Sequence, residues 1–87
     1  MVIVQGPRYT INAEDISYTK VELVNKLYFL LVYMKNEESM CIQKYSRKEH
    51  ADSERLALGK YLSECHVFGL YEVRNNEYWA KMQLLDG

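Results

Sequence analysis

Two cysteines and two histidines are the side chains of this sequence that could ligate a metal ion or form a nucleophile–base pair: Cys41, Cys65, His50 and His66. Structural zinc sites usually hold their ligands in close, spaced pairs. Cys65 and His66 are instead adjacent, and adjacent side chains seldom reach one ion. Neither cysteine has an identifiable orienting group or a glycine-rich oxyanion turn. We therefore predict no metal, no cofactor and no catalytic residue. Because two thiols and two imidazoles are present, a small-ligand or metal sensor is kept as a further functional class, behind the two considered below.

Other catalytic patterns are also absent from the sequence. The acidic pairs Glu14-Asp15 and Glu37-Glu38 fall in predicted turns, where charges are usually solvated. The four glycines are too far apart to form a phosphate-binding loop or a dinucleotide fingerprint. The sequence therefore predicts a protein that is not an enzyme.

Tyrosine is the compositional outlier, with eight copies in 87 residues. A tyrosine buries a large ring and keeps a hydroxyl for water or a partner, so it favours strands and interfaces. The candidate partner-binding residues are Trp79, Tyr78, Tyr71, Tyr28 and Tyr33. Trp79 is the first choice, because a tryptophan among charged residues either covers a sheet edge or anchors a partner.

Basic residues cluster from the end of one predicted strand through the start of a predicted helix: Lys44, Arg47, Lys48 and Arg55. Backbone amides at a helix start favour anions, and tyrosines on an open sheet could stack unpaired bases. Acidic residues interleave with these cations, however, and ion pairs on a solvated helix face explain the charges more simply. Nucleic-acid binding is therefore the alternative function.

Length and composition indicate one small domain that spans residues 1–87. Apolar residues make up 48% and charged residues 26% of the chain, and the net charge is −1, as in ordinary globular proteins. Met1–Val4 is too short for a signal peptide, and the longest apolar run, Leu27–Met34, is too short to span a bilayer as a helix. We expect a cytoplasmic protein with no membrane segment and with free thiols.

The first half of the chain reads as extended segments separated by turns. The expected strands are Val2–Gln5, Arg8–Ile11, Ile16–Val24, Leu27–Met34 and Met40–Tyr45. Gly6-Pro7 ends the first of them, and Asn25-Lys26 suits a hairpin loop between the third and the fourth. Leu27–Met34 is apolar on both of its faces, which is typical of a central strand covered on both sides.

A helix over about residues 47–64 follows. Ser46 and Glu49 match the capping-box pattern at its start. Gly59 inside this helix costs stability, so we expect the helix to approach the sheet closely there.

The last segment predicts a β-hairpin of Val67–Arg74 and Glu77–Leu84 about an Asn75-Asn76 turn. A helix over Asn76–Leu84 is the competing interpretation. The fold class is therefore α+β: a small antiparallel β-meander, one helix, then a C-terminal hairpin. The order is β-β-β-β-α-β-β or β-β-β-α-β-β.

One helix can cover only one face of the central strand. The C-terminal hairpin, a second copy of the chain or a different protein could cover the other face. We therefore expect a non-catalytic protein-binding or inhibitory, regulatory module, of the kind that microbes and mobile elements encode. We expect it to form a homodimer.

Overall fold

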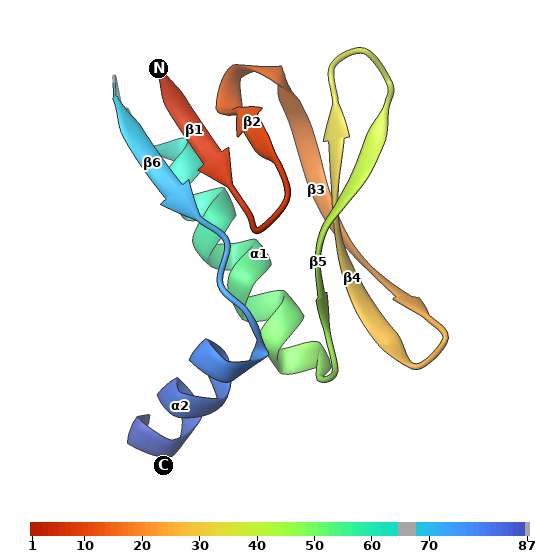
Figure 1. Cartoon of the computed structure of the whole chain (residues 1–87), viewed down its shortest axis with the longest axis vertical. Coiled ribbons are helices and arrows are strands. Elements are labelled where there is room, and N and C mark those ends of the chain that lie inside the picture. Colours follow the sequence, from red (N-terminus) through yellow and green to blue (C-terminus); the bar gives the residue numbers. More distant parts are fainter. Residues whose placement is uncertain (65–67, 87) are drawn as a thin grey trace.

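The computed structural model describes residues 1–64 and 68–86 and contains two three-stranded sheets, a long helix and a short C-terminal helix (Figure 1). In chain order the elements are β1 (Val2–Gln5), β2 (Thr10–Asn12), the 3-10 turn η1 (Ala13–Asp15), β3 (Ile16–Val24), β4 (Leu27–Met34), β5 (Ser39–Tyr45), α1 (Lys48–Ser63), β6 (Gly69–Glu72) and α2 (Asn76–Asp86). The α+β fold class is confirmed. None of the described helices combines the length and the apolar character that crossing a bilayer requires.

The strands β3, β4 and β5 form the predicted antiparallel meander, with β4 in the middle. Asn25 and Lys26 both have positive φ, 49° and 67°, which is the backbone of a type I′ turn. This turn pairs Val24 with Leu27 and so fixes the register of the whole β3–β4 ladder. Both the hairpin loop and the central position of Leu27–Met34 are confirmed.

The two faces of β4 have different surroundings. Leu30 and Val32 are fully buried against α1 and the sheet formed by β1, β2 and β6, as the alternation of a strand requires. A β-bulge in β5 lets Ile42 join the same core. The helix therefore covers the Leu30 side of the meander and leaves the other side uncovered.

The second sheet has the strand order β2-β1-β6, with β2 antiparallel and β6 parallel to β1. Val4 and Ile11 from this sheet enter the common core. The sequence predicted that β6 would pair with residues 77–84, and that prediction is wrong. The backbone groups of β6 bond instead to β1, which lies far from it in the chain.

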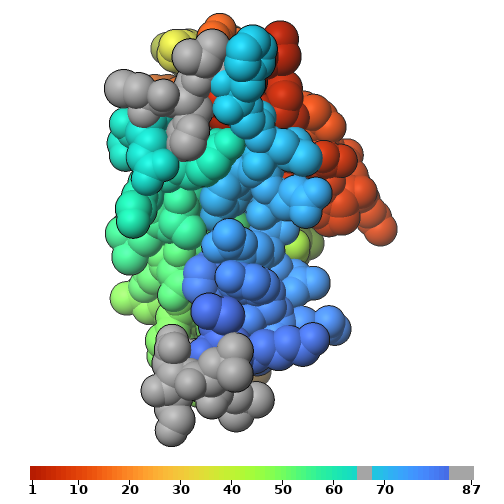
Figure 2. Space-filling view, turned by 90° about the vertical axis from the view of Figure 1, so that its left-hand side faces the viewer, coloured from red at the N-terminus to blue at the C-terminus, as the bar shows by residue number. Residues whose placement is uncertain are grey.

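The predicted C-terminal hairpin is wrong, and the competing helical interpretation is confirmed by α2. Asn75 Oδ1 accepts a hydrogen bond of 3.1 Å from the N–H of Tyr78, so this asparagine caps a helix instead of turning a hairpin. Asparagine suits both positions, because its side chain can bond to nearby backbone in either. Val67, the first residue of the predicted first strand of this hairpin, lies outside the described residues. Figure 2 shows β6 and α2 side by side with α1.

Helix α1 agrees with the predicted 47–64 within one residue at each end. The predicted capping box is wrong: Arg47 is the N-cap residue and makes no side-chain cap bond. The backbone N–H of Ser46 donates instead to Asn76 Oδ1 at 3.1 Å. The prediction for Gly59 is also wrong, since a Cβ at this position would meet nothing within 4 Å.

Candidate functional site

The uncovered side of the meander is an apolar surface that we call the open face. Its residues come from β3, β4 and β5: Tyr18, Lys20, Glu22, Leu27, Phe29, Leu31, Tyr33 and Lys44. Phe29, Leu31 and Tyr33 are half-buried by their neighbours on the sheet, but none of them packs against the core. Tyr18 is 54% exposed and Leu27 38%. In the part of the chain that the structure describes, the helices and the other sheet all lie on the opposite side (Figure 1).

Aromatic contacts organise this face. The rings of Tyr18 and Tyr33 stack with their centroids 4.5 Å apart and an interplanar angle of 5°. Lys44 Nζ lies 5.0 Å from the centroid of the Phe29 ring. These contacts hold flat rings and an ammonium group against the sheet, which limits the side-chain entropy that binding would cost.

Charges of both signs border the apolar centre. Glu22 on β3 and Lys44 on β5 flank Phe29 in one cross-strand row. Lys20 stands beside Leu31 in the next row. None of these three charges forms an ion pair with another described residue, so they remain available to a partner.

A buried carboxylate on the other side of the molecule holds the C-terminal segment. Glu54 on α1 is 0% exposed. Its Oε1 accepts from the Tyr71 hydroxyl at 2.8 Å and from the Arg74 backbone N–H at 3.0 Å. Its Oε2 accepts from the indole N–H of Trp79 at 3.1 Å. We call these four residues the Glu54 cluster.

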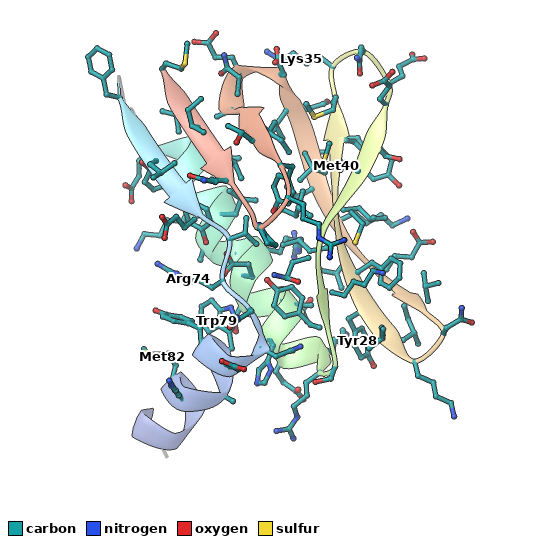
Figure 3. The ribbon with its side chains drawn as sticks, in the orientation of Figure 1. Tyr28, Lys35, Met40, Arg74, Trp79 and Met82 are labelled. Atoms are coloured by element: carbon teal, nitrogen blue, oxygen red, sulfur yellow. The ribbon has the colours of Figure 1, made fainter. Side chains whose placement is uncertain are left out.

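Burial raises the pKa of Glu54, and the hydrogen bonds and the nearby Arg74 guanidinium oppose this shift. The Arg74 guanidinium carbon lies 4.8 Å from the Tyr78 ring centroid and 5.8 Å from that of Trp79. Figure 3 shows Arg74 and Trp79 next to each other above α2. The carboxylate is enclosed and its oxygens are occupied, so it acts as a structural tie between α1, β6 and α2 rather than as an exposed acid or base.

The structure scatters the candidate partner-binding tyrosines and Trp79. Trp79 and Tyr71 belong to the Glu54 cluster, and Tyr71 is buried. Tyr78 is exposed on α2, where its ring lies edge-on to Trp79 at 5.0 Å. Tyr28 lies on the α1 side of β4 and packs against the core. Only Tyr33 lies on the open face.

The candidate nucleic-acid residues do not form one patch. Lys44 lies on the open face, and Arg47 pairs with Glu49. Lys48 and Arg55 lie on α1, on the other side of the meander, where they line a hollow beside β3. Lys44 is thus separated from Lys48 and Arg55 by the meander.

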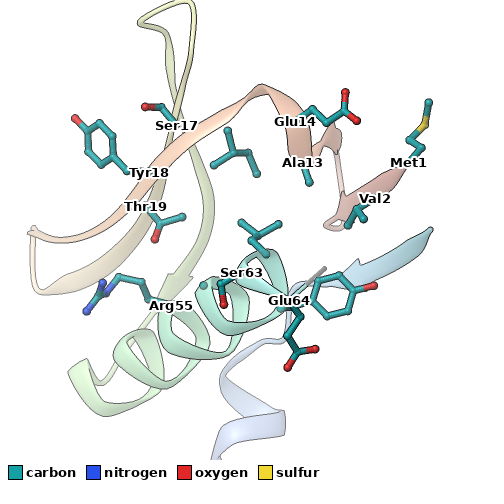
Figure 4. A pocket seen from close by; sticks show the side chains of 14 residues that line it. Met1, Val2, Ala13, Glu14, Ser17, Tyr18, Thr19, Arg55, Ser63 and Glu64 are labelled. Carbon is teal, nitrogen blue, oxygen red and sulfur yellow. The ribbon is translucent and has the colours of Figure 1, made fainter. Parts of the chain in front are cut away.

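Two adjoining hollows run between β3 and α1, and together we call them the β3–α1 groove. The first has a volume of about 650 Å³ and the second of about 560 Å³, and both are lined by Thr19 and Arg55. Figure 4 shows the first hollow, with Thr19 on β3 facing Arg55 and Ser63 on α1.

The candidate metal and thiol residues do not converge in the described part of the chain. No group of three His, Cys, Asp or Glu side chains there is placed to share an ion. Burial raises the pKa of the half-buried Cys41 thiol, which disfavours the reactive thiolate. Cys65 and His66 lie outside the described residues.

Sequence reasoning missed Glu54, which it treated as one anion on a solvated helix face. A signal was present: Glu54 lies three residues after Ala51 and four before Leu58, on the stripe that faces the core. A carboxylate at such a position requires buried donors, and Tyr71 and Trp79 supply them.

Comparison of the chain with models of protein families, with curated proteins and with solved structures finds no match.

Proposed function

We propose that this protein is a non-catalytic protein-binding module, of an inhibitory or regulatory kind, that self-associates through the open face. Removing apolar surface of this kind from water lowers the free energy, so its burial against a partner favours association. The uncovered side of the central strand β4 is the observation that supports this function. A reducing cytoplasmic setting, in which the free Cys41 thiol is stable, belongs to the same proposal.

The open face is complementary to itself. A two-fold axis parallel to β4 exchanges β3 and β5 between two stacked sheets, because these strands flank β4 on either side. Glu22 of each copy then faces Lys44 of the other, since both residues lie level with Phe29. Phe29 and Leu31 occupy the centre of the interface, where two sheets stack about 10 Å apart. The arrangement buries the apolar centre and pairs the charges at its borders.

Charge reversal tests this arrangement. We expect Glu22→Lys or Lys44→Glu alone to weaken self-association at least about tenfold, because each variant brings like charges face to face. The double variant restores the pairing with its sign reversed and should recover most of the affinity. Arg8→Glu, a reversal in the exposed turn after β1, is the matched control and should change nothing.

Sedimentation velocity over a range of protein concentrations measures the association. A protein that stays monomeric at every concentration would exclude self-association. A dimer that is unaffected by either single reversal would show that another surface forms the interface.

A further inference from the structure

The β3–α1 groove runs along a free strand edge. In the described part of the chain β3 pairs with β4 alone, so the other edge of this nine-residue strand has no strand beside it. The outer edge of the other border strand, β5, is contacted by the loop after β1, where the Tyr9 hydroxyl donates to the Ile42 carbonyl at 2.8 Å. A free edge presents backbone N–H and C=O groups that can pair with another extended chain.

The lining of the groove shows that it reaches the backbone of β3. Ser17, Tyr18 and Thr19 line the first hollow, and Thr19, Lys20 and Val21 line the second. Successive side chains of a strand point to opposite faces. A hollow that touches three consecutive residues therefore touches the backbone of the strand as well as its side chains.

The opposite wall of the groove contains a glycine that the fold does not need. Gly59 is an exposed residue of α1 and lines the first hollow, one helical turn after Arg55. A Cβ added to it would meet nothing within 4 Å. Glycine inside a helix is less stable than alanine, so this position keeps a costly residue that no contact within the molecule explains. What it provides is width in the groove, which lets a second backbone pass close to the helix.

The charges and apolar side chains of the second hollow indicate which kind of polypeptide segment could bind there. Lys48 and Arg55 line it against one acid, Asp52, and none of the three forms an ion pair with a described residue. Leu23, which is 61% exposed, also lines this hollow. The hollow therefore offers two cations and an apolar contact to its occupant.

We infer that the β3–α1 groove binds an extended, acidic segment of a partner polypeptide, which adds as a new strand to the edge of β3. Backbone hydrogen bonds to β3 supply affinity. An acidic side chain of the segment contacts Arg55 and Lys48, and an apolar side chain two positions along contacts Leu23. This surface is distinct from the open face, so the protein has one surface for a second copy and another for its partner.

Selection from a phage-displayed random-peptide library tests this inference. Parallel selections use the wild-type protein and the Gly59→Phe variant, whose added ring fills the groove. We expect acidic peptides to be enriched on the wild type and not on Gly59→Phe. Enrichment of no peptide, or of the same peptides on both proteins, would overturn the inference.

Fluorescence anisotropy with an enriched, labelled peptide then measures affinity. Arg55→Glu should weaken binding at least about tenfold, whereas Lys60→Glu, a reversal on α1 outside the groove, should not. Thermal melting serves as the folding control: Gly59→Ala should melt above the wild type and Gly59→Phe should stay folded. On peptide binding, alternate amides of β3 should become protected from hydrogen exchange. Protection confined to other strands would contradict strand addition to β3.

A second copy of the chain is the competing occupant. If Gly59→Phe abolished self-association, the groove would be a homodimer interface and the inference would be wrong. The single reversals Glu22→Lys and Lys44→Glu, which test the open face, should leave peptide binding intact, so the two proposals fail independently.

Discussion

The indole N–H of Trp79 donates a hydrogen bond of 3.1 Å to Glu54 Oε2, and this bond joins α2 to the middle of α1. The same carboxylate accepts from Tyr71 on β6 and from the backbone of Arg74. The Tyr45 hydroxyl in turn donates to the Arg74 carbonyl, so the meander is tied to the same point. One buried side chain thereby positions three segments that local sequence signals leave undecided.

Removing the Glu54 carboxylate should strongly destabilise the folded protein. Glu54→Ala leaves the Tyr71 hydroxyl, the Trp79 indole and the Arg74 N–H without their acceptor, at about 1–3 kcal/mol for each donor that stays buried. A domain of this size has a stability of only a few kcal/mol. We therefore expect Glu54→Ala to be largely unfolded at room temperature in circular dichroism. A cooperative urea transition within about 1 kcal/mol of the wild type would contradict this account of the cluster.

The pH dependence of stability should report the same residue. Burial raises the pKa of Glu54, so the folded state binds its proton more tightly than the unfolded state does. The stabilisation that this tighter proton binding gives the folded state is therefore fully present below the unfolded pKa of about 4.3. It is lost as pH rises through the folded pKa of Glu54. Glu54→Gln has no titrating group, so its stability relative to the wild type should improve as pH rises above about 4.3. Urea unfolding of both proteins across this pH range measures the difference, and parallel curves would show that the pKa of Glu54 is not raised.

Single hydrogen bonds of the cluster should have smaller effects. Tyr71→Phe removes the 2.8 Å bond to Glu54 Oε1 but keeps the buried ring. We expect a loss of about 1.5–3 kcal/mol in the free energy of unfolding, as for a hydrogen bond to a charged group. Tyr33→Phe on the open face, whose ring stacks on Tyr18, is the matched control and should cost much less.

The cap of α2 can be tested directly. Asn75→Ala removes the side-chain acceptor for the Tyr78 N–H and should cost about 1 kcal/mol, whereas Asn75→Asp should retain most of the stability. A type I′ hairpin turn would respond differently, because it favours glycine at positive φ. A stabilising effect of Asn75→Gly would therefore contradict the helical C-terminus.

Two glycines should respond in opposite directions to alanine. A Cβ on Gly6 would lie 2.1 Å from the Tyr9 ring, which packs over this turn and reaches Ile42 through its hydroxyl. Gly6→Ala should therefore displace Tyr9 and destabilise the protein. Gly59→Ala should stabilise it by about 0.5–1 kcal/mol, since the new methyl group meets no atom. Chemical denaturation of both variants measures whether the free energy of unfolding falls for Gly6→Ala and rises for Gly59→Ala.

The sequence by itself determined the elements whose signals are local. The positive-φ pair Asn25-Lys26 and the apolar run Leu27–Met34 specify the β3–β4 hairpin and its central strand. The helix over Lys48–Ser63 was also placed correctly, although the capping box that predicted its start does not form. Turn chemistry and periodicity act between residues that are close in the chain, so they can be read without knowledge of what packs nearby.

Tertiary structure alone decided the C-terminal segment and the role of Glu54. The alternating pattern of residues 77–84 favoured a strand, with a helix over residues 76–84 as the competing interpretation, and Asn75 suits the turn of one and the cap of the other. The outcome depends on Trp79 meeting a buried acceptor on α1 and on β6 finding its backbone partners in β1. Such contacts join residues that are distant in the chain, and a buried carboxylate and its donors are stable only when they come together.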